Sequence, residues 1–339
     1  TVLNILVIGL GSIGRRHLAN LAGMGHRVSA VSSKRKPLAG TETAPAPAVE
    51  PVAVYASLER AFSAASFDAA FICSPTAFHA KALIFLLQEQ VPRIYVEKPL
   101  FDQWEPVPTI RALAARYGPQ ICVGYDLHFE PGFAQVNTLL SCNGIGRLLS
   151  VQAFAGQYLP QWRPYEDHRT GMSAKTETGG GVLLDLIHEI DYLLQFAGNA
   201  RSVYCKTTNS GSLGIETEES ADLLLDFDDR VSATLHLDYL QPSLTRFATF
   251  TGTGGTIVWN LAERSVSHTT HGMQPNLFSY QNADRNDRFL AIERAFLENP
   301  TDSRLVHLET GLKSLRVVLA AKKSVAENSQ VTLTENLFQ

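Results

Sequence analysis

A glycine-rich turn near the start of the chain constrains the fold more than any other feature. Residues 9–14 read Gly-Leu-Gly-Ser-Ile-Gly and directly follow an apolar run, residues 3–8, with the length and composition of a β-strand. In such a turn the first glycine permits a tight bend, the second lets a pyrophosphate approach the backbone, and the third lets the next helix pack closely. The alternative interpretation is an incidental glycine-rich turn.

The start of the helix after this turn is the predicted phosphate site. Backbone N–H groups at a helix N-terminus carry partial positive charge and bind phosphates, and Arg15 and Arg16 add full charges. We therefore predict that the turn and the first helical residues hold a dinucleotide. The predicted residues are Gly9, Gly11, Ser12, Ile13, Gly14 and Arg15.

Short apolar runs alternate with helix-length segments through the first third of the chain. The runs are residues 3–8, 27–31, 52–55, 69–72, 94–96 and 121–123. This alternation predicts a parallel sheet covered on both faces, so residues 1–123 are expected to form a doubly wound Rossmann domain. Residues 37–51 contain four prolines and are expected to form an exposed loop rather than a crossover helix.

Longer strand-like runs follow and predict a second domain, residues 124–339. These runs are residues 147–156, 203–208, 221–227, 231–239, 247–251 and 256–260. We predict an α+β domain with a large, mostly antiparallel open sheet, one face of which is covered by helices at 181–196 and 306–326. Since an open apolar face usually finds a partner subunit, a homodimer or homotetramer formed through it is expected.

Composition excludes several classes of partner. The chain has 339 residues, of which 45% are hydrophobic, enough for two cores. The 29 basic and 33 acidic residues give a net charge of −4, so neither nucleic acid nor an anionic membrane surface is an expected partner. Four cysteines without a C-x-x-C pair predict neither a metal site nor a disulfide framework, and we expect a cytoplasmic protein.

The end of the second predicted strand bears on the choice of cofactor. An acidic residue about 20 positions beyond the glycines would bind the ribose 2′-hydroxyl of NAD. Here Ser32 stands 18 residues beyond Gly14, and Ser33, Lys34 and Arg35 follow it without a nearby carboxylate. Hydroxyls and cations suit a 2′-phosphate, so NADP is favoured over NAD. The alternative is that Lys34 and Arg35 only solvate a loop.

Five separated motifs occur in order along the chain. They are the glycine turn at 9–14, Ser74-Pro75-Thr76 with His79, Glu97-Lys98-Pro99, Gly124-Tyr125, and Gly179-Gly180-Gly181 leading to Asp185 and His188. With these motifs the chain, up to about residue 198, resembles the Gfo/Idh/MocA family of oxidoreductases. The resemblance implies a Rossmann domain, a second domain with an open sheet, and a sugar, cyclitol or nucleotide-sugar substrate. It also implies that cofactor contacts come from Ser74, Pro75, Thr76, His79, Glu97 and Lys98.

Lys98 is the first candidate for proton transfer. Removing hydride from a carbinol carbon leaves a carbonyl only if the hydroxyl proton also departs, which requires a base within hydrogen-bond reach. Lys98 follows the fifth predicted strand, at the carboxyl edge where doubly wound sheets bind ligands. The like charge of an oxidised nicotinamide would disfavour its ammonium form. The alternative is a solvated lysine at a strand end.

His188 is the second candidate, on the helix predicted from residue 181. Asp185 and Asp191 stand three residues either side of it and are expected to share its helix face. A neighbouring carboxylate would fix the tautomer of the imidazole, so Asp185 is a further catalytic candidate. Many relatives place this aspartate four residues before the histidine, not three. The alternative is that His188 is a structural histidine. If it is catalytic, we expect Lys98 and His188 to lie beside the same nicotinamide ring.

Substrate recognition is expected from Tyr125 and from the loop at 157–178. Aromatic rings stack on sugar rings, and planar cations bind hydroxyls or carboxylates. The candidates in the loop are Tyr158, Trp162, Arg163, Arg169 and Lys175. Residues 156–160 and 173–175 resemble the branch of this family found with surface-polysaccharide and sialic-acid-type pathways, which implies that the three cations bind an acidic sugar or a sugar phosphate. The alternative role for this loop is a subunit contact.

These observations favour an NAD(P)-dependent oxidoreductase that interconverts a secondary alcohol and a ketone on a sugar-like small molecule. One alternative is a non-catalytic regulator that senses a dinucleotide on the same fold. Another is a glycosidase that uses a transient oxidation by NAD without net turnover of the cofactor. The presence of both Lys98 and His188 argues against the regulator.

Overall fold

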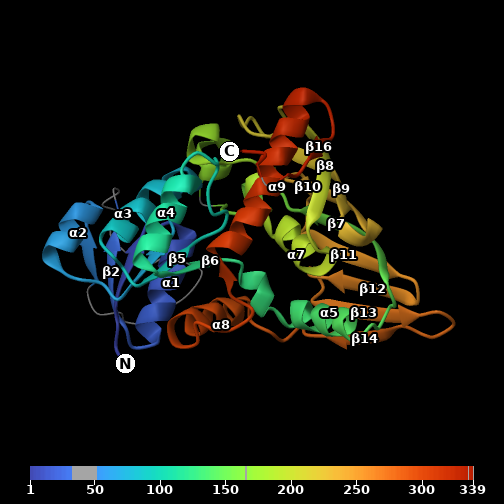
Figure 1. The fold of residues 1–339 in the computed structure, drawn as a ribbon, viewed down its shortest axis with the longest axis horizontal. Helices are drawn as coiled ribbons and strands as arrows, with labels where there is room; N and C mark the ends of the chain where they lie inside the picture. The colour runs from blue at the N-terminus through green and yellow to red at the C-terminus, as the bar shows by residue number, and fades with distance from the viewer. Residues whose placement is uncertain (33–51, 165, 335, 339) are drawn as a thin grey trace. The chain divides into compact units, whose positions relative to one another are not determined.

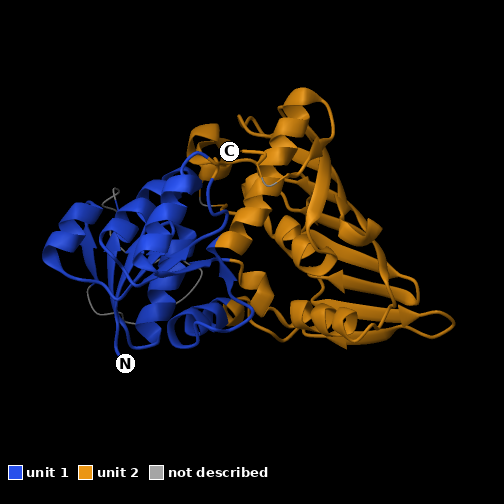
Figure 2. Ribbon diagram, viewed as in Figure 1, with its two compact units in different colours: residues 1–101, 105–124, 289–308 blue, residues 102–104, 125–288, 309–339 orange. Residues whose placement is uncertain are grey.

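The chain forms two compact units that do not follow the sequence in simple order. The computed structural model describes residues 1–32, 52–164, 166–334 and 336–338 (Figure 1). The first unit contains residues 1–101, 105–124 and 289–308, and the second contains residues 102–104, 125–288 and 309–339 (Figure 2). The predicted proline-rich loop at 37–51 lies outside the described residues.

The first unit is built on a seven-stranded sheet in the order β15-β6-β5-β4-β1-β2-β3. Its strands are β1 (Asn4–Ile8), β2 (Arg27–Val31), β3 (Ala53–Tyr55), β4 (Ala69–Ile72), β5 (Arg93–Val96), β6 (Gln120–Val123) and β15 (Val306–His307). All neighbours are parallel except β15 and β6. This order confirms the predicted Rossmann topology, in which the chain reverses direction across the sheet between β1 and β4.

Helices cover both faces of this sheet, which is why its central strands are apolar throughout. The helices are α1 (Ser12–Gly23), α2 (Leu58–Ala64), α3 (His79–Gln88), α4 (Val107–Tyr117) and most of α8 (Arg285–Glu298). Leu6 and Val7 of β1 have no exposed surface, nor have Leu83 and Leu86 of α3. Burial of these aliphatic side chains supplies the main stabilisation of the unit.

The predicted domain boundary omitted a late segment. The first unit ends its main run at Gly124, but residues 289–308 return to it, whereas the sequence analysis assigned them to the second domain. The return is explained by β15, in which Val306 pairs with Val123 and His307 with Cys122 of β6. The predicted helix at 306–326 therefore begins after this short strand, as α9 (Leu308–Glu327).

The second unit is built on a nine-stranded sheet in the order β14-β13-β12-β11-β7-β10-β9-β8-β16. Its strands are β7 (Leu148–Gly156), β8 (Ala200–Thr208), β9 (Ser220–Phe227), β10 (Ser232–Asp238), β11 (Thr245–Gly252), β12 (Gly255–Asn260), β13 (Ser265–Thr270), β14 (Asn276–Ser279) and β16 (Val331–Thr332). The neighbours β7 and β10 are parallel and the rest are antiparallel. The mostly antiparallel sheet confirms the predicted fold class.

Among the described residues, the helices of this unit cover one face of the sheet. Helices α5 (Pro131–Ser141), α7 (His188–Ala197) and α9 lie along the same side of the strands in Figure 1. Burial alternates along β9, where Leu223 and Leu225 are buried and Leu224 is 51% exposed. The period of two is that of a strand with one packed face and one open face.

The predicted continuous helix at 181–196 is interrupted. The structure has a single turn, α6 (Val182–Asp185), and then α7 from His188. Leu186 between them has φ −101° and ψ 31°, outside the helical region, and the next helix begins two residues later, at His188. Among the described residues no helix combines the length and the hydropathy needed to cross a membrane.

A buried ion pair ties α7 to the sheet of the second unit. The Glu189 side chain has no exposed surface, and its carboxylate accepts hydrogen bonds from Nε of Arg246 at 2.6 Å and from Nη2 at 3.1 Å. Such a two-point contact offsets the loss of hydration of both charges only while both partners are present.

Arg246→Met should therefore lower the free energy of unfolding by about 3 to 5 kcal/mol, because Glu189 would stay buried without its partner. Combining it with Glu189→Leu should recover most of this loss. Lys323→Met removes the exposed pair between Lys323 and Glu327 in the same unit and should cost less than about 1 kcal/mol. Urea denaturation followed by circular dichroism measures all three, and equal costs for the two single variants would contradict the assignment.

Candidate functional site

The glycine turn after β1 has the geometry expected of a phosphate-binding loop. Gly9 has φ +96°, and a Cβ there would lie 2.8 Å from the carbonyl oxygen of Cys73. A Cβ on Gly14 would overlap the carbonyl oxygen of Gly9. By contrast, a Cβ on Gly11 would meet no atom of the described chain within 4 Å. Gly9 and Gly14 are thus required by the chain's own packing, whereas the space beside Gly11 is open.

Helix α1 presents its N-terminus to this open space. Gly11 is its N-cap, no side chain caps it, and its first turn contains no acidic residue. The helix start is therefore suited to an anionic group. Arg15 binds the turn itself, because its Nε donates to the carbonyl of Leu10 at 3.0 Å.

Of the four residues predicted to contact the 2′-position of the ribose, the structure describes only Ser32. Ser32 follows β2, is half-buried, and donates its backbone N–H to Tyr55 at 3.1 Å. Ser33, Lys34 and Arg35 lie outside the described residues. The prediction of a 2′-phosphate site therefore stays a prediction.

His79 holds together the two loops that follow β4 and β5. Its side chain is buried, with Nε2 at 2.7 Å from the carbonyl oxygen of Ser74 and Nδ1 at 3.0 Å from that of Pro99. Burial lowers its pKa, although the carbonyl contacts act in the opposite direction. We infer that His79 supports the site through the backbone. Thr76 is buried and Pro75 half-buried in the same loop.

The hydroxyl group of Ser74 is a buried polar atom that the chain does not satisfy. Among the described residues it has no hydrogen-bond partner. A buried hydroxyl without a partner is costly, and such atoms in a binding loop suit contact with a ligand or water. With the open space at Gly11, this is the second observation that fits a nucleotide.

Glu97, Lys98 and Pro99 lie at the carboxyl end of β5, and the Lys98–Pro99 peptide is cis. The Glu97 carboxylate is directed into the interior, where Oε1 lies 2.8 Å from Nε2 of His17 and Oε2 accepts the backbone N–H of Lys98 at 3.2 Å. Sequence analysis placed Glu97 against the cofactor, whereas these contacts place it behind Lys98. The Lys98 side chain is half-buried.

His17 is a site residue that sequence analysis did not single out. It is buried on α1, and Nδ1 lies 2.5 Å from Oε1 of Glu293 on α8. The only local signal was a histidine on the buried stripe of an amphipathic helix. Its partners, 80 and 276 residues away, could not be identified without the fold.

In the second unit His188 begins α7 and is paired with Asp126. Its Nε2 lies 3.4 Å from Oδ1 of Asp126, which also forms an ion pair with Arg288. The ring of Tyr125 packs edge-on against the imidazole, with centroids 5.7 Å apart. Tyr125 is fully buried, so it supports the His188 ring, in addition to its predicted role toward substrate. Asp126 and Arg288 were not predicted.

The two aspartates that flank His188 in sequence have other partners. Asp185 accepts a hydrogen bond from the Tyr239 hydroxyl at 2.6 Å, and Asp191 lies 2.6 Å from Nε2 of His128. The expectation that both would flank the imidazole rested on a continuous helix, and the break at Leu186 changes that geometry. His128 is also stacked on Phe133, with centroids 4.4 Å apart, which makes it a packing residue.

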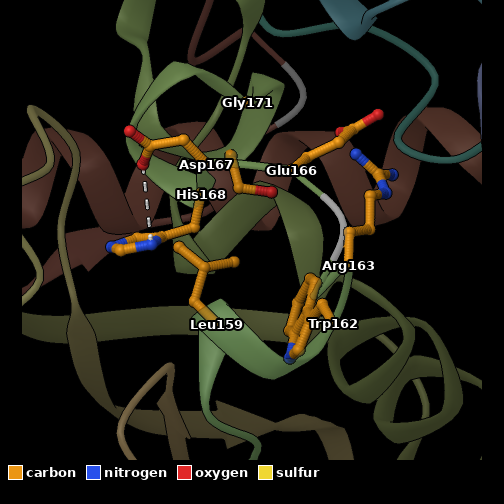
Figure 3. Close-up of a pocket in the computed structure, with 8 residues that line it drawn as sticks. Leu159, Trp162, Arg163, Glu166, Asp167, His168 and Gly171 are labelled. Carbon is orange, nitrogen blue, oxygen red and sulfur yellow. Dashed lines mark ion pairs between the residues drawn. The ribbon is translucent and has the colours of Figure 1, made fainter.

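The predicted substrate loop consists of successive single turns. They are η3 (Leu159–Gln161), η4 (His168–Thr170), η5 (Met172–Ala174) and η6 (Thr176–Thr178). Trp162 and Arg163 lie on one side of a small hollow between these turns, and Asp167 and His168 lie on the other (Figure 3). The hollow has a volume of about 20 Å³, which is room for one water molecule. It is therefore not a sugar pocket by itself.

The cations of this loop are engaged to different degrees. Arg169 donates to both carboxylate oxygens of Asp167, through Nε at 2.9 Å and Nη2 at 2.8 Å, and hydrogen bonds to Arg169 lower the pKa of Asp167 to about 2. Lys175 lies 3.7 Å from Glu177, and Tyr158 is half-buried before η3. Trp162 packs edge-on against Tyr239, with centroids 5.4 Å apart.

Within the described residues no group of three or more His, Cys, Asp and Glu side chains could hold a metal ion.

The chain matches two protein-family models. Residues 3–125 match a family described as an oxidoreductase family with an NAD-binding Rossmann fold, and residues 133–258 match the GFO/IDH/MocA C-terminal domain. The chain belongs to the GFO/IDH/MocA oxidoreductase family. The first match covers the glycine turn and Lys98, and the second covers His188, so each unit contributes a matched domain with a candidate residue.

Individual relatives are distant. An uncharacterized oxidoreductase of Bacillus subtilis, YrbE, is 26% identical over 203 residues, which are 59% of this chain and 55% of the relative. Myo-inositol dehydrogenase Hyg17 of Streptomyces leeuwenhoekii is 28% identical over 240 residues, or 70% of this chain and 66% of the relative. These matches thus span little more than half to two thirds of the relatives' lengths.

A solved structure shares the complete fold. The WlbA dehydrogenase of Bordetella pertussis, determined in complex with NADH and UDP-GlcNAcA, superimposes with a TM-score of 0.81. The superposition covers 98% of both chains at 19% identity. At this identity the likeness concerns the fold.

The open space at Gly11 can be tested directly. Gly11→Ala should leave thermal stability unchanged, because its Cβ meets no atom of the described residues and its φ is −70°, yet it should weaken NADPH and NADH binding at least ~10-fold by occupying the phosphate position. Titration by nicotinamide fluorescence measures the binding. Gly23→Ala, at the other end of α1 and equally unobstructed, is the matched control and should bind both nucleotides normally. Unimpaired binding by Gly11→Ala would refute the assignment.

Proposed function

We propose that this protein is an NAD(P)-dependent oxidoreductase that transfers a hydride between nicotinamide and a secondary alcohol or ketone of a sugar, cyclitol or nucleotide-sugar. One observation carries the proposal. The open helix start at Gly11 and residue Lys98 follow the carboxyl ends of β1 and β5, which are separated by β4 alone in the sheet. This edge is where doubly wound sheets hold their ligands.

The cofactor, when bound, supplies the hydride acceptor or donor. The residues of the chain supply the complementary proton transfer. In oxidation, the hydroxyl proton of the substrate passes to Lys98 and His188, directly or in relay, as the C–H hydride leaves. In reduction the same groups return a proton to the new alkoxide oxygen. The Asp126 carboxylate, 3.4 Å from Nε2 of His188, orients the imidazole, as the partner does in acid–base pairs.

NADP is the proposed preferred cofactor, with NAD as the alternative. The support is the chemistry of Ser32, Ser33, Lys34 and Arg35, which offers hydroxyls and cations in place of an acidic residue. In this position NAD enzymes commonly carry a carboxylate that binds the 2′-hydroxyl. Parallel titrations with the phosphorylated and unphosphorylated nucleotides decide the matter.

A sugar-like substrate is supported by the names of distant relatives and by the loop at 157–178. One relative is a myo-inositol dehydrogenase, and one structural neighbour holds UDP-GlcNAcA. We propose that Tyr158, Trp162, Arg163, Arg169 and Lys175 contribute to recognition of an acidic sugar or sugar phosphate. Because Arg169 is already paired with Asp167, substrate would compete for it.

A homodimer or homotetramer through the open sheet face is the proposed assembly. Phe154 stacks on His236 at 4.7 Å and on Phe247 at 5.7 Å, and Leu224 and Tyr204 of neighbouring strands are 51% and 38% exposed. This face offers stacked aromatic rings and aliphatic side chains to a second copy. Sedimentation analysis of the intact protein measures the number of subunits.

The function is tested with a panel of sugars, cyclitols and nucleotide-sugars, read at 340 nm with each nucleotide. Net formation or loss of reduced nicotinamide supports the proposal. Nucleotide binding without any turnover on the panel would favour a dinucleotide-sensing regulator. Glycoside cleavage with an unchanged oxidation state of the cofactor would favour a glycosidase.

Lys98→Met and His188→Ala should each lower kcat at least ~10²-fold, because each removes a proton-transfer group. Lys323→Met is the control for loss of a lysine on the surface and should retain full activity. Steady-state kinetics with the best substrate of the panel measures the effect. If either site variant stays within about threefold of the parent, its assigned role is wrong.

A further inference from the structure

A buried histidine connects the nucleotide-binding helix to the segment that carries Lys98. His17 has no exposed surface and stands three residues beyond Gly14 on α1. Its Nε2 lies 2.8 Å from Oε1 of Glu97, and its Nδ1 lies 2.5 Å from Oε1 of Glu293. One ring thus joins α1, the end of β5 and α8 within the first unit.

The ring is held as an imidazolium. Each of its nitrogens faces a carboxylate oxygen, so the contact is complete only if both nitrogens donate a proton. Burial by itself would lower the pKa of His17, but the hydrogen bonds and charges of Glu293 and Glu97 raise it to about 9. Phe71 and Tyr95, with ring centroids 5.3 and 5.2 Å from that of His17, pack around the ring. Charge-assisted hydrogen bonds in such surroundings are strong and directional.

The second oxygen of Glu97 extends this connection to Lys98. Oε2 accepts the backbone N–H of Lys98 at 3.2 Å, while Oε1 is held by His17. A carboxylate fixed at one oxygen presents the other at a defined position. The backbone from which the Lys98 side chain departs is therefore set by an ion pair with the same helix whose N-terminus faces the open space at Gly11.

We propose that His17 is a positioning residue for Lys98, acting through Glu97. Helix α1 carries both the proposed nucleotide site and His17. The contact of His17 with Glu97 therefore sets the position of the Lys98 amine relative to the nucleotide. The inference rests on the proposed role of Lys98 in proton transfer. It assigns no contact between His17 and the substrate or the cofactor.

Three variants separate positioning from simple packing. His17→Leu removes both donors, His17→Gln keeps an amide with two N–H donors, and Phe71→Leu removes ring packing beside His17 without altering the contacts of Glu97. His17→Leu should lower kcat at least ~10-fold while the Kd for NADPH changes less than about threefold, since misplacing a reacting group by ~1 Å can lower the rate by up to about 10²-fold. His17→Gln should restore most of kcat. Phe71→Leu should lower the melting temperature and leave kcat near that of the parent.

Hydrogen exchange gives a readout that requires neither cofactor nor turnover. In His17→Leu the amide of Lys98 should exchange at least ~10-fold faster, because Glu97 no longer holds it, whereas Phe71→Leu should leave its exchange unchanged. If His17→Leu does not fold, His17→Asn, with a shorter amide, takes its place in both measurements. Equal exchange at Lys98 in all variants, or a loss of kcat in Phe71→Leu matching that of the His17 variant, would overturn the proposal.

Lys98→Met measured in the same series separates this inference from the function on which it rests. If Lys98→Met keeps its turnover, the role proposed for Lys98 fails, and with it the purpose assigned to His17. If Lys98→Met is inactive but His17→Leu has the kcat of the parent, only the positioning role fails.

Discussion

The close approach of two backbone segments at the first glycine turn is the constraint on which the first unit depends. Helix α1 can start where it does only because Gly14 has no Cβ to collide with Gly9, and Gly9 can adopt φ +96° beside Cys73. This contact places the helix N-terminus at the sheet edge and His17 one turn further into the core. From His17 a buried ion pair reaches Glu97, whose carboxylate also binds the backbone N–H of Lys98. Helix α1 therefore supports both the proposed nucleotide site and Lys98.

In the second unit the corresponding constraint is the burial of charged side chains between the sheet and the helices that cover it. His188, Asp126 and Arg288 form one cluster, while His128 with Asp191 and Glu189 with Arg246 form two more. Each charge is matched by a partner from a segment distant in sequence. Buried pairs of this kind add little net stability over apolar packing, but they strongly disfavour arrangements that separate the partners. They therefore fix where α7, and with it His188, begins.

Sequence patterns were sufficient for the strands that carry an aliphatic run or a clear period-two alternation. Strands β1 to β6 and β7 to β12 were predicted because aliphatic runs or period-two alternation mark them. The strands β13 to β16 were missed. Ser265–Thr270 and Asn276–Ser279 are polar or exposed and carry no such pattern, while Val306–His307 and Val331–Thr332 are only two residues long. Lys98 and His188 could be singled out from motifs, whereas Asp126 and Arg288 became partners of His188 only through long-range folding. The helix break at Leu186 has no marker such as proline or glycine in the sequence.

The late return of residues 289–308 has a consequence for evolution and engineering of the chain. A fragment that stops at Gly124 would lack β15, exposing the edge of β6, and would lack Glu293, leaving the His17 imidazolium with one carboxylate. The nucleotide module is therefore not separable by a single cut. Recombination between relatives would have to exchange two distant stretches together to preserve its core.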